Sequence, residues 1–179
     1  MKYFTKKMWA GWQGRDAAVW NAAFKTSSTA YMKQLAALKN RLSKRNHALF
    51  TAMPFHDSRL IELRMGEPSA TAWKADPPAF TPFPTAVEMD VLTCDRRFCY
   101  TLRYKQVRNV QVNFPSDQPL FYEEGSGLDD WGYDELTAAD ERFLSHEILF
   151  SSGATILIEF MVFNYSRCKL AVSRPRKLG

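Results

Sequence analysis

Hydrophobic and polar residues alternate along most of the chain after residue 55, which is the period of a half-buried β-strand. Val87, Met89 and Val91, for example, are separated by acidic residues. Segments with this strand pattern are 60–65, a meander of 87–91, 98–104 and 107–114, and a hairpin of 146–150 and 156–160 that turns at Ser151-Ser152-Gly153. Because short connections join antiparallel neighbours, the pattern predicts a predominantly antiparallel sheet.

The first 50 residues follow the helical period instead, with apolar residues three and four positions apart. A narrow apolar stripe predicts an amphipathic helix that Ser27 or Ser28 can cap. Lys33, Arg41 and Lys44 lie on the opposite side, so we expect the stripe to dock on the sheet and the basic side to meet water. The stripe consists of Tyr31, Leu35, Leu38, Leu42 and Leu49.

An earlier helical stretch carries Trp9, Trp12 and Trp20, and Gly11 and Gly14 break it into two pieces. A stripe of tryptophans can form a binding face. Such a stripe more often belongs to the core of a protein, and we interpret it in that way.

These patterns together predict a single α+β domain over residues 1–172, in which N-terminal helices pack on a predominantly antiparallel β-sheet. Within it, 1–50 is helical and 55–172 is β-rich. A proline-rich loop spans 67–84, where five prolines exclude a helix or an inner strand. Residues 173–179 form a basic tail.

The composition fits one domain of ordinary size, because 179 residues that are 46% hydrophobic can bury a core without metal or disulfide staples. The three cysteines, Cys94, Cys99 and Cys168, lack CxxC spacing, which is typical of free thiols in a reducing compartment. The start of the chain lacks the apolar core of a signal peptide, and the longest apolar run, 154–163, is too short for a membrane span. We therefore expect a cytoplasmic protein without a membrane partner.

The net charge of +5 is distributed unevenly along the chain. Residues 1–50 carry ten lysines and arginines against Asp16 alone, a net charge of +9. Residues 117–147 carry ten acidic residues against Arg142 alone, a net charge of −9. The basic helices could contact nucleic acid. However, no zinc-finger, helix-turn-helix or RNA-binding aromatic pattern accompanies them, so we favour solvated faces and consider nucleic acid an unlikely partner.

The usual catalytic fingerprints are absent from the sequence, which has only three histidines and no HExxH, GxSxG or phosphate-binding glycine loop. One alternative is a hydrolase or metal-assisted enzyme that uses His56, Asp57, Glu135 and His146. Neighbouring residues on an extended chain point to opposite faces, so His56 and Asp57 converge only in a turn. We favour a turn that Asp57 caps, and we expect no cofactor and no metal.

Several short segments of the chain form a familiar set, namely Met1-Lys2-Tyr3-Phe4-Thr5-Lys6, 55–61, Tyr133-Asp134-Glu135, 146–153 and Ile158-Glu159-Phe160. They resemble a bacterial family of unknown function, domain-of-unknown-function family 4085. The resemblance implies a bacterial, intracellular protein with a helical start and a β-sheet body, and it implies no activity. The His56-Asp57 entry into a strand is also similar to small β-rich proteins found beside bacterial toxins, including immunity proteins.

The leading hypothesis is therefore a non-catalytic protein-interaction module, of which an immunity-type inhibitor of a toxin is the specific form. Separated charge patches steer a charged partner, and the acidic segment fits a basic, nuclease-like protein. The expected partner-binding residues are Glu123, Glu124, Asp129, Asp130 and Asp134. The sequence leaves the oligomeric state open.

Overall fold

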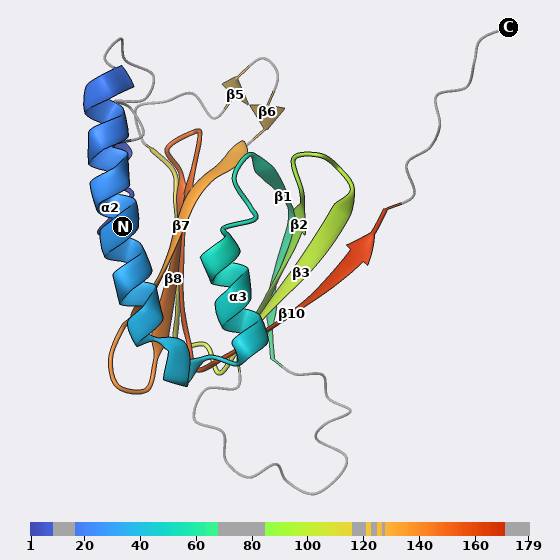
Figure 1. The fold of residues 1–179 in the computed structure, drawn as a ribbon. Helices are drawn as coiled ribbons and strands as arrows, with labels where there is room; N and C mark the ends of the chain where they lie inside the picture. Colours follow the sequence, from blue (N-terminus) through green and yellow to red (C-terminus); the bar gives the residue numbers. More distant parts are fainter. Residues whose placement is uncertain (9–16, 68–84, 116–120, 123–124, 127, 171–179) are drawn as a thin grey trace, which may run out of the picture.

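The computed structural model describes residues 1–8, 17–67, 85–115, 121–122, 125–126 and 128–170, and the structural statements below concern these ranges. The chain folds into an eight-stranded antiparallel sheet with its helices in the N-terminal part (Figure 1). This confirms the predicted α+β class. The helices are α2 (Ala17–Ala37), the 3-10 turn η1 (Lys39–Arg41) and α3 (Lys44–Ala52).

The strands of the main sheet follow the order β10-β3-β2-β1-β7-β8-β9-β4. Their bounds are β1 (Ser58–Gly66), β2 (Ala86–Leu92), β3 (Phe98–Lys105), β4 (Asn109–Asn113), β7 (Asp130–Ala138), β8 (Leu144–Phe150), β9 (Thr155–Phe160) and β10 (Val162–Lys169). A separate two-stranded hairpin consists of β5 (Phe121–Tyr122) and β6 (Gly125–Ser126).

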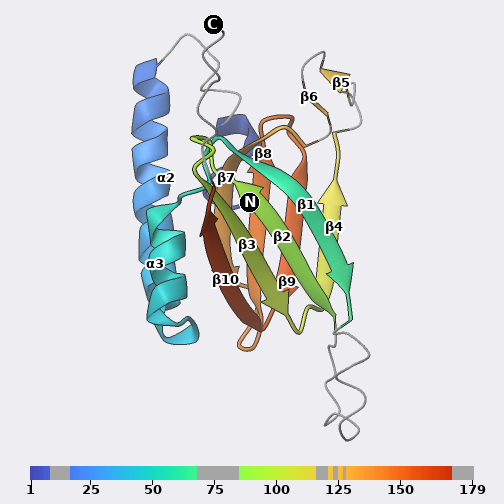
Figure 2. The same cartoon turned by 90° about the vertical axis from the view of Figure 1, so that its right-hand side faces the viewer.

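The large sheet bends into two four-stranded halves, because β1 and β7 pair only where Ser58 and Arg59 meet the start of β7. Beyond that corner the halves β10-β3-β2-β1 and β7-β8-β9-β4 face each other (Figures 1 and 2). Tyr104 of β3 packs edge-on against Phe160 of β9, with ring centroids 5.0 Å apart. The main core therefore lies between the two halves, and strands of both contribute to it.

The two helices cover the same flank of the molecule (Figure 2). On α2, Tyr31 is fully buried and its hydroxyl accepts a hydrogen bond from the backbone N–H of Leu136 at 3.0 Å. On α3, Asn46 donates from Nδ2 to the carbonyl oxygen of Phe163 in β10 at 2.7 Å. The helices thus attach to both halves of the sheet, α2 to β7 and α3 to β10.

The single long helix predicted from the leucine stripe is wrong, because the stripe is divided between two helices. Leu42, directly after η1, has an extended backbone, which interrupts the helical path. Ser43 then caps α3 by accepting a hydrogen bond from the N–H of Asn46. Ser27 and Ser28 lie inside α2 and cap nothing. Tyr31, Leu35, Leu38 and Leu49 are nevertheless buried, as the stripe predicted.

The strand at 109–113 is predicted correctly, but its expected place in the meander is wrong. It pairs with β9, while the place beside β3 belongs to β10. Gln106 has a left-handed backbone (φ +54°), which turns the chain away from β3 after Lys105. The predicted strands at 87–91 and 98–104 and the hairpin of 146–150 with 156–160 are confirmed.

Trp9, Trp12, the proline-rich loop over 68–84 and the tail over 173–179 lie outside the described residues. In the described part of the chain, no helix combines the length and the apolar character that crossing a membrane requires.

Candidate functional site

A bulge in β7 decides which acidic side chains face the core. Trp131 pairs with Phe150 of β8, whereas Tyr133 already pairs with Leu149, so one extra residue stands at Gly132. Side chains normally alternate along a strand, and the extra residue shifts this alternation by one position. Trp131 and Asp134 consequently lie on the same face, although three positions separate them.

Four side chains on this face form a continuous hydrogen-bonded chain, which we call the core network: Tyr104, His146, Asp134 and Trp131. The indole Nε1–H of Trp131 donates to Oδ1 of Asp134 at 3.0 Å, and Nε2 of His146 lies 3.1 Å from Oδ2 of the same carboxylate. Because an ionised carboxylate only accepts, His146 donates from Nε2. In the neutral tautomer that this leaves, Nδ1 accepts a hydrogen bond from the Tyr104 hydroxyl at 2.7 Å.

The core network is sealed from solvent. Tyr104, His146 and Trp131 are 0% exposed and Asp134 is 4% exposed. Burial, and then the charge of Asp134, hold the pKa of Tyr104 well above its ordinary value, so the phenol keeps its proton. A Tyr–His–Asp arrangement is capable of acid–base chemistry when a substrate reaches it. In this protein the core network connects β3 in one half of the sheet with β7 and β8 in the other.

Glu135 lies on the opposite face of β7 and binds the first residues of the chain. Its carboxylate accepts hydrogen bonds from the backbone N–H groups of Lys2, Tyr3 and Phe4 at 2.7, 2.6 and 2.5 Å. The side chain is 1% exposed, and its neighbour on β8, Glu147, forms an ion pair with the amino group of Met1. Glu135 is therefore a structural anchor for this segment.

His56 and Asp57 do converge, because Asp57 has a left-handed backbone (φ +59°) that creates the turn. Nδ1 of His56 lies 3.0 Å from Oδ1 of Asp57, and the side chains are 40% and 60% exposed. The His56 ring packs edge-on against Tyr133.

The structure thus separates the four residues of the enzyme alternative: His56 and Asp57 are together at the surface, His146 is in the core, and Glu135 is on the outer side of β7. Nor do the described residues contain a cluster of three or more His, Cys, Asp or Glu side chains that could hold a metal ion.

A polar concavity of about 240 Å³ lies where β1, β7 and the β2–β3 turn meet. Its lining residues are Asp57, Arg59, Leu92, Thr93, Cys94, Arg96 and Asp130. Non-glycine residues with left-handed backbones gather here, namely Asp57, Arg96 (φ +54°) and Asp129 (φ +65°). Such conformations cost energy and cluster at functional sites. We therefore regard this concavity as the candidate site.

The walls of the concavity are held by short-range polar contacts. Thr93 donates from its hydroxyl to Asp95 at 2.6 Å, and Asp95 also accepts from the backbone N–H of Arg97 at 3.0 Å. These two bonds lower the pKa of Asp95 and fix the β2–β3 turn. Across the concavity, Nε of Arg59 donates to Oδ1 of Asp130 at 3.1 Å. The sequence did not predict Arg59, Thr93 and Arg96 as site residues. The local signal that could have pointed to them is the turn sequence Cys94-Asp95-Arg96-Arg97.

The predicted partner-binding residues separate into three groups. Asp129 and Asp130 lie partly exposed at and beside the concavity, where Oδ2 of Asp129 accepts from the Ser151 hydroxyl at 2.8 Å. The prediction that Asp134 lies on the binding surface is wrong, because the Gly132 bulge turns its side chain into the core. Glu123 and Glu124 lie outside the described residues.

The predicted basic face of the helices is present on the surface. Lys25, Lys33, Lys39 and Lys44 are exposed on α2, η1 and α3. Arg41 reaches the acidic segment and donates to the carbonyl oxygen of Asp140 at 2.7 Å. The basic and acidic segments therefore meet at this point.

Searches against family models, curated proteins and solved structures found no match to this chain. The resemblance to domain-of-unknown-function family 4085 therefore stays a prediction.

Proposed function

We propose that this protein is a protein-interaction module that binds a basic partner through the carboxylates at the concavity. The observation that carries the proposal is that Asp57 and Asp130 both line one concavity, with Asp129 next to Asp130 in the chain and left-handed backbones at Asp57 and Asp129. The specific form that we propose is an immunity-type inhibitor that masks a bacterial toxin in the cytoplasm.

The lining holds Arg59 and Arg96 as well as Asp57 and Asp130, and the exposed ion pair within it supports a binding role. The ion pair of Arg59 with Asp130 is about half exposed, so it contributes little to folding stability and can rearrange at small cost. A guanidinium from a partner can then replace Arg59 on Asp130, and a second cation can reach Asp57. Acidic groups at a rim accelerate encounter with a basic protein and make that rate depend on salt.

The enzyme alternative has less support, because some of its acid–base groups are buried and the others are exposed. His146 and Glu135 are buried with their hydrogen-bonding atoms already used by protein groups. Of the exposed pair, His56 and Asp57, Asp57 lines the proposed binding site.

The test is affinity capture from the native cells with the tagged full chain and two matched double variants. Asp57→Asn/Asp130→Asn removes two negative charges at the concavity. Glu62→Gln/Glu141→Gln removes two negative charges at exposed positions elsewhere on the surface. We expect the first variant to lose the captured protein and the second to retain it.

Kinetics with the purified partner sharpen this result. The concavity variant should associate about tenfold more slowly at low salt, with a weaker dependence of the rate on salt. Equal association rates for both double variants would reject the concavity. Capture of nucleic acid by all variants, with steep salt dependence, would instead assign function to the exposed lysines of the helices.

A further inference from the structure

The strand β4 is one edge of the eight-stranded sheet, and within the described residues it pairs only with β9 (Figure 2). The side of its backbone that faces away from β9 therefore offers N–H and C=O groups to another strand. Proteins usually protect such an edge with charged residues, proline or a bulge. Residues 109–113 contain no charged residue and no proline, and their pairing with β9 has no register shift.

The opposite edge of the sheet is protected. On β10, the carbonyl oxygen of Phe163 accepts from Asn46, and that of Tyr165 accepts from Arg45 at 3.1 Å. Helix α3 thus occupies hydrogen-bonding groups of that edge. Among the described residues, β4 therefore lacks the kind of contact that protects β10.

The sequence of β4 reads the same in both directions: Asn109-Val110-Gln111-Val112-Asn113. If two copies of this strand lie antiparallel about a two-fold axis at Gln111, each residue meets an identical type. Asn109 then faces Asn113 of the second copy, Val110 faces Val112, and Gln111 faces Gln111. Two-fold dimers require this kind of self-complementary surface.

The two faces of β4 also match under this rotation. Val110 and Val112 pair with Ile158 and Ile156, which are fully buried, so these valines lie on the core side of the sheet. Val112 is nevertheless 40% exposed, and β4 is the last strand of the sheet in the described part of the chain. In the two-fold arrangement the valines of both copies form one apolar row, and the Asn and Gln side chains form one polar row.

We propose that β4 is a homodimer interface, in which the β4 strands of two copies pair antiparallel about Gln111 and join their sheets. This proposal is independent of the binding site at the concavity. No like charges meet in the ladder, and the flanking Arg108 is already paired with Asp140 and Glu159. A ladder of five residues from each copy buries less than the roughly 1,200 Å² of a standard interface, so the dimer is weak and concentration-dependent.

The test uses charge exchange at Gln111, whose side chain is exposed and faces itself across the axis. Sedimentation velocity over a concentration series should show a reversible monomer–dimer equilibrium for the wild type. Gln111→Lys and Gln111→Glu should each raise the dimer Kd about tenfold at low salt, because like charges then face each other. An equimolar mixture of the two variants should restore dimerisation, because lysine then faces glutamate.

Asn164→Lys is the matched control, because it adds a charge at an exposed position on the protected edge strand β10 and should leave the Kd unchanged. Circular dichroism and urea midpoints verify that each variant is folded. A wild type that stays monomeric across the series overturns the proposal. So does a mixture of folded variants that fails to associate, since only pairing about residue 111 brings the two charges together.

Discussion

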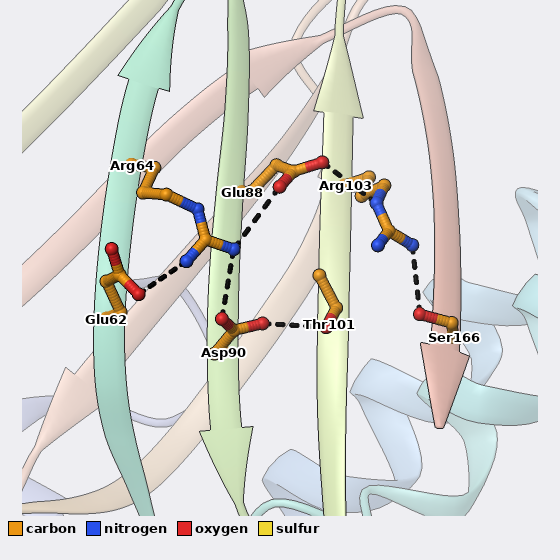
Figure 3. A network of polar contacts seen from close by, with 7 residues as sticks. All are labelled: Glu62, Arg64, Glu88, Asp90, Thr101, Arg103 and Ser166. Atoms are coloured by element: carbon orange, nitrogen blue, oxygen red, sulfur yellow. Dashed lines mark hydrogen bonds and ion pairs between the residues drawn. The ribbon is translucent and has the colours of Figure 1, made fainter. Parts of the chain in front are cut away.

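Two networks of polar side chains join strands in this protein, one inside the core and one on the surface of the sheet. The core network consists of Tyr104, His146, Asp134 and Trp131. The surface network lies on the solvent-facing side of β1, β2, β3 and β10 and consists of Glu62, Arg64, Glu88, Asp90, Thr101, Arg103 and Ser166 (Figure 3). Both contain carboxylates held by donors at hydrogen-bonding distance.

The surface network has more members and more charge. Arg64 reaches Glu62 at 2.5 Å, Asp90 at 2.9 Å and Glu88 at 3.3 Å (Figure 3). Arg103 continues it from Glu88 at 2.8 Å. Water can replace any of these contacts, since the arginine side chains are 42% and 37% exposed. In the core network, no water can replace a lost partner, so fewer hydrogen bonds carry a larger stability effect.

Asp134→Ala should produce the largest effect, because it removes one acceptor from two buried donors. The indole N–H of Trp131 and Nε2 of His146 are left without partners in the core. We expect the free energy of unfolding to fall by about 3–5 kcal/mol, measured by urea denaturation at neutral pH.

Asp134→Asn is the matched control, because its amide oxygen can still accept from Trp131. It should cost less than the alanine variant. If Asp134→Ala were as stable as the wild type, Asp134 would not anchor the core.

Tyr104→Phe should have the second largest effect. It removes one hydroxyl group, leaves the ring packed against Phe160 and Phe163, and deprives Nδ1 of His146 of its donor. We expect a loss of about 1–2 kcal/mol in the free energy of unfolding. Tyr100→Phe makes the same chemical change on the same strand, where the hydroxyl has only a 3.5 Å contact with Arg167. Equal losses for the two variants would contradict a special role for the core network.

Some features of the fold could be predicted from the sequence and others could not. The strands and the last hairpin follow from the alternation of apolar and polar residues, which depends only on neighbours along the chain. The partner of β4 does not follow, because it depends on the left-handed turn at Gln106 and on β10 taking the place beside β3. Pairing between distant strands leaves no such local signal.

The burial of Asp134 was equally hard to predict. An aspartate beside a glutamate in an acidic segment is normally exposed, and its partner His146 lies twelve positions away. One local signal existed: a glycine inside a strand often marks a bulge, and Gly132 does so here. A bulge at that position reverses the face of Asp134, which converts the predicted surface residue into a core residue.

Arg64→Ala should have a small effect although it removes three contacts at once. Its partners are partly exposed and regain water, so we expect only a small fall in the free energy of unfolding, well below that of Tyr104→Phe. The loss should shrink further in high salt, because salt screens exposed charges. Denaturation in low and high salt measures both quantities. A loss as large as that of Tyr104→Phe would erase the difference between the two networks.

The pH dependence of the surface network gives the smallest and most local effect. Partial burial raises the pKa of Asp90, but the hydrogen bonds from Thr101 (2.6 Å) and Arg64 outweigh burial, so the pKa is lowered overall. A carboxyl whose folded pKa is lower than its unfolded pKa stabilises the fold above about pH 4. That contribution is lost as the pH falls through the folded pKa.

Titration of the Asp90 carboxyl by NMR should therefore give a midpoint below that of an ordinary aspartate. Thr101→Val removes one of the two stabilising donors and should move the midpoint upward. Thr29→Val is the control, because its hydroxyl bonds only to the backbone of α2 at Lys25. An Asp90 midpoint that Thr101→Val leaves unchanged would show that the surface contacts do not hold the carboxylate in solution. The surface network would then contribute even less than its exposure implies, and its contrast with the core network would increase.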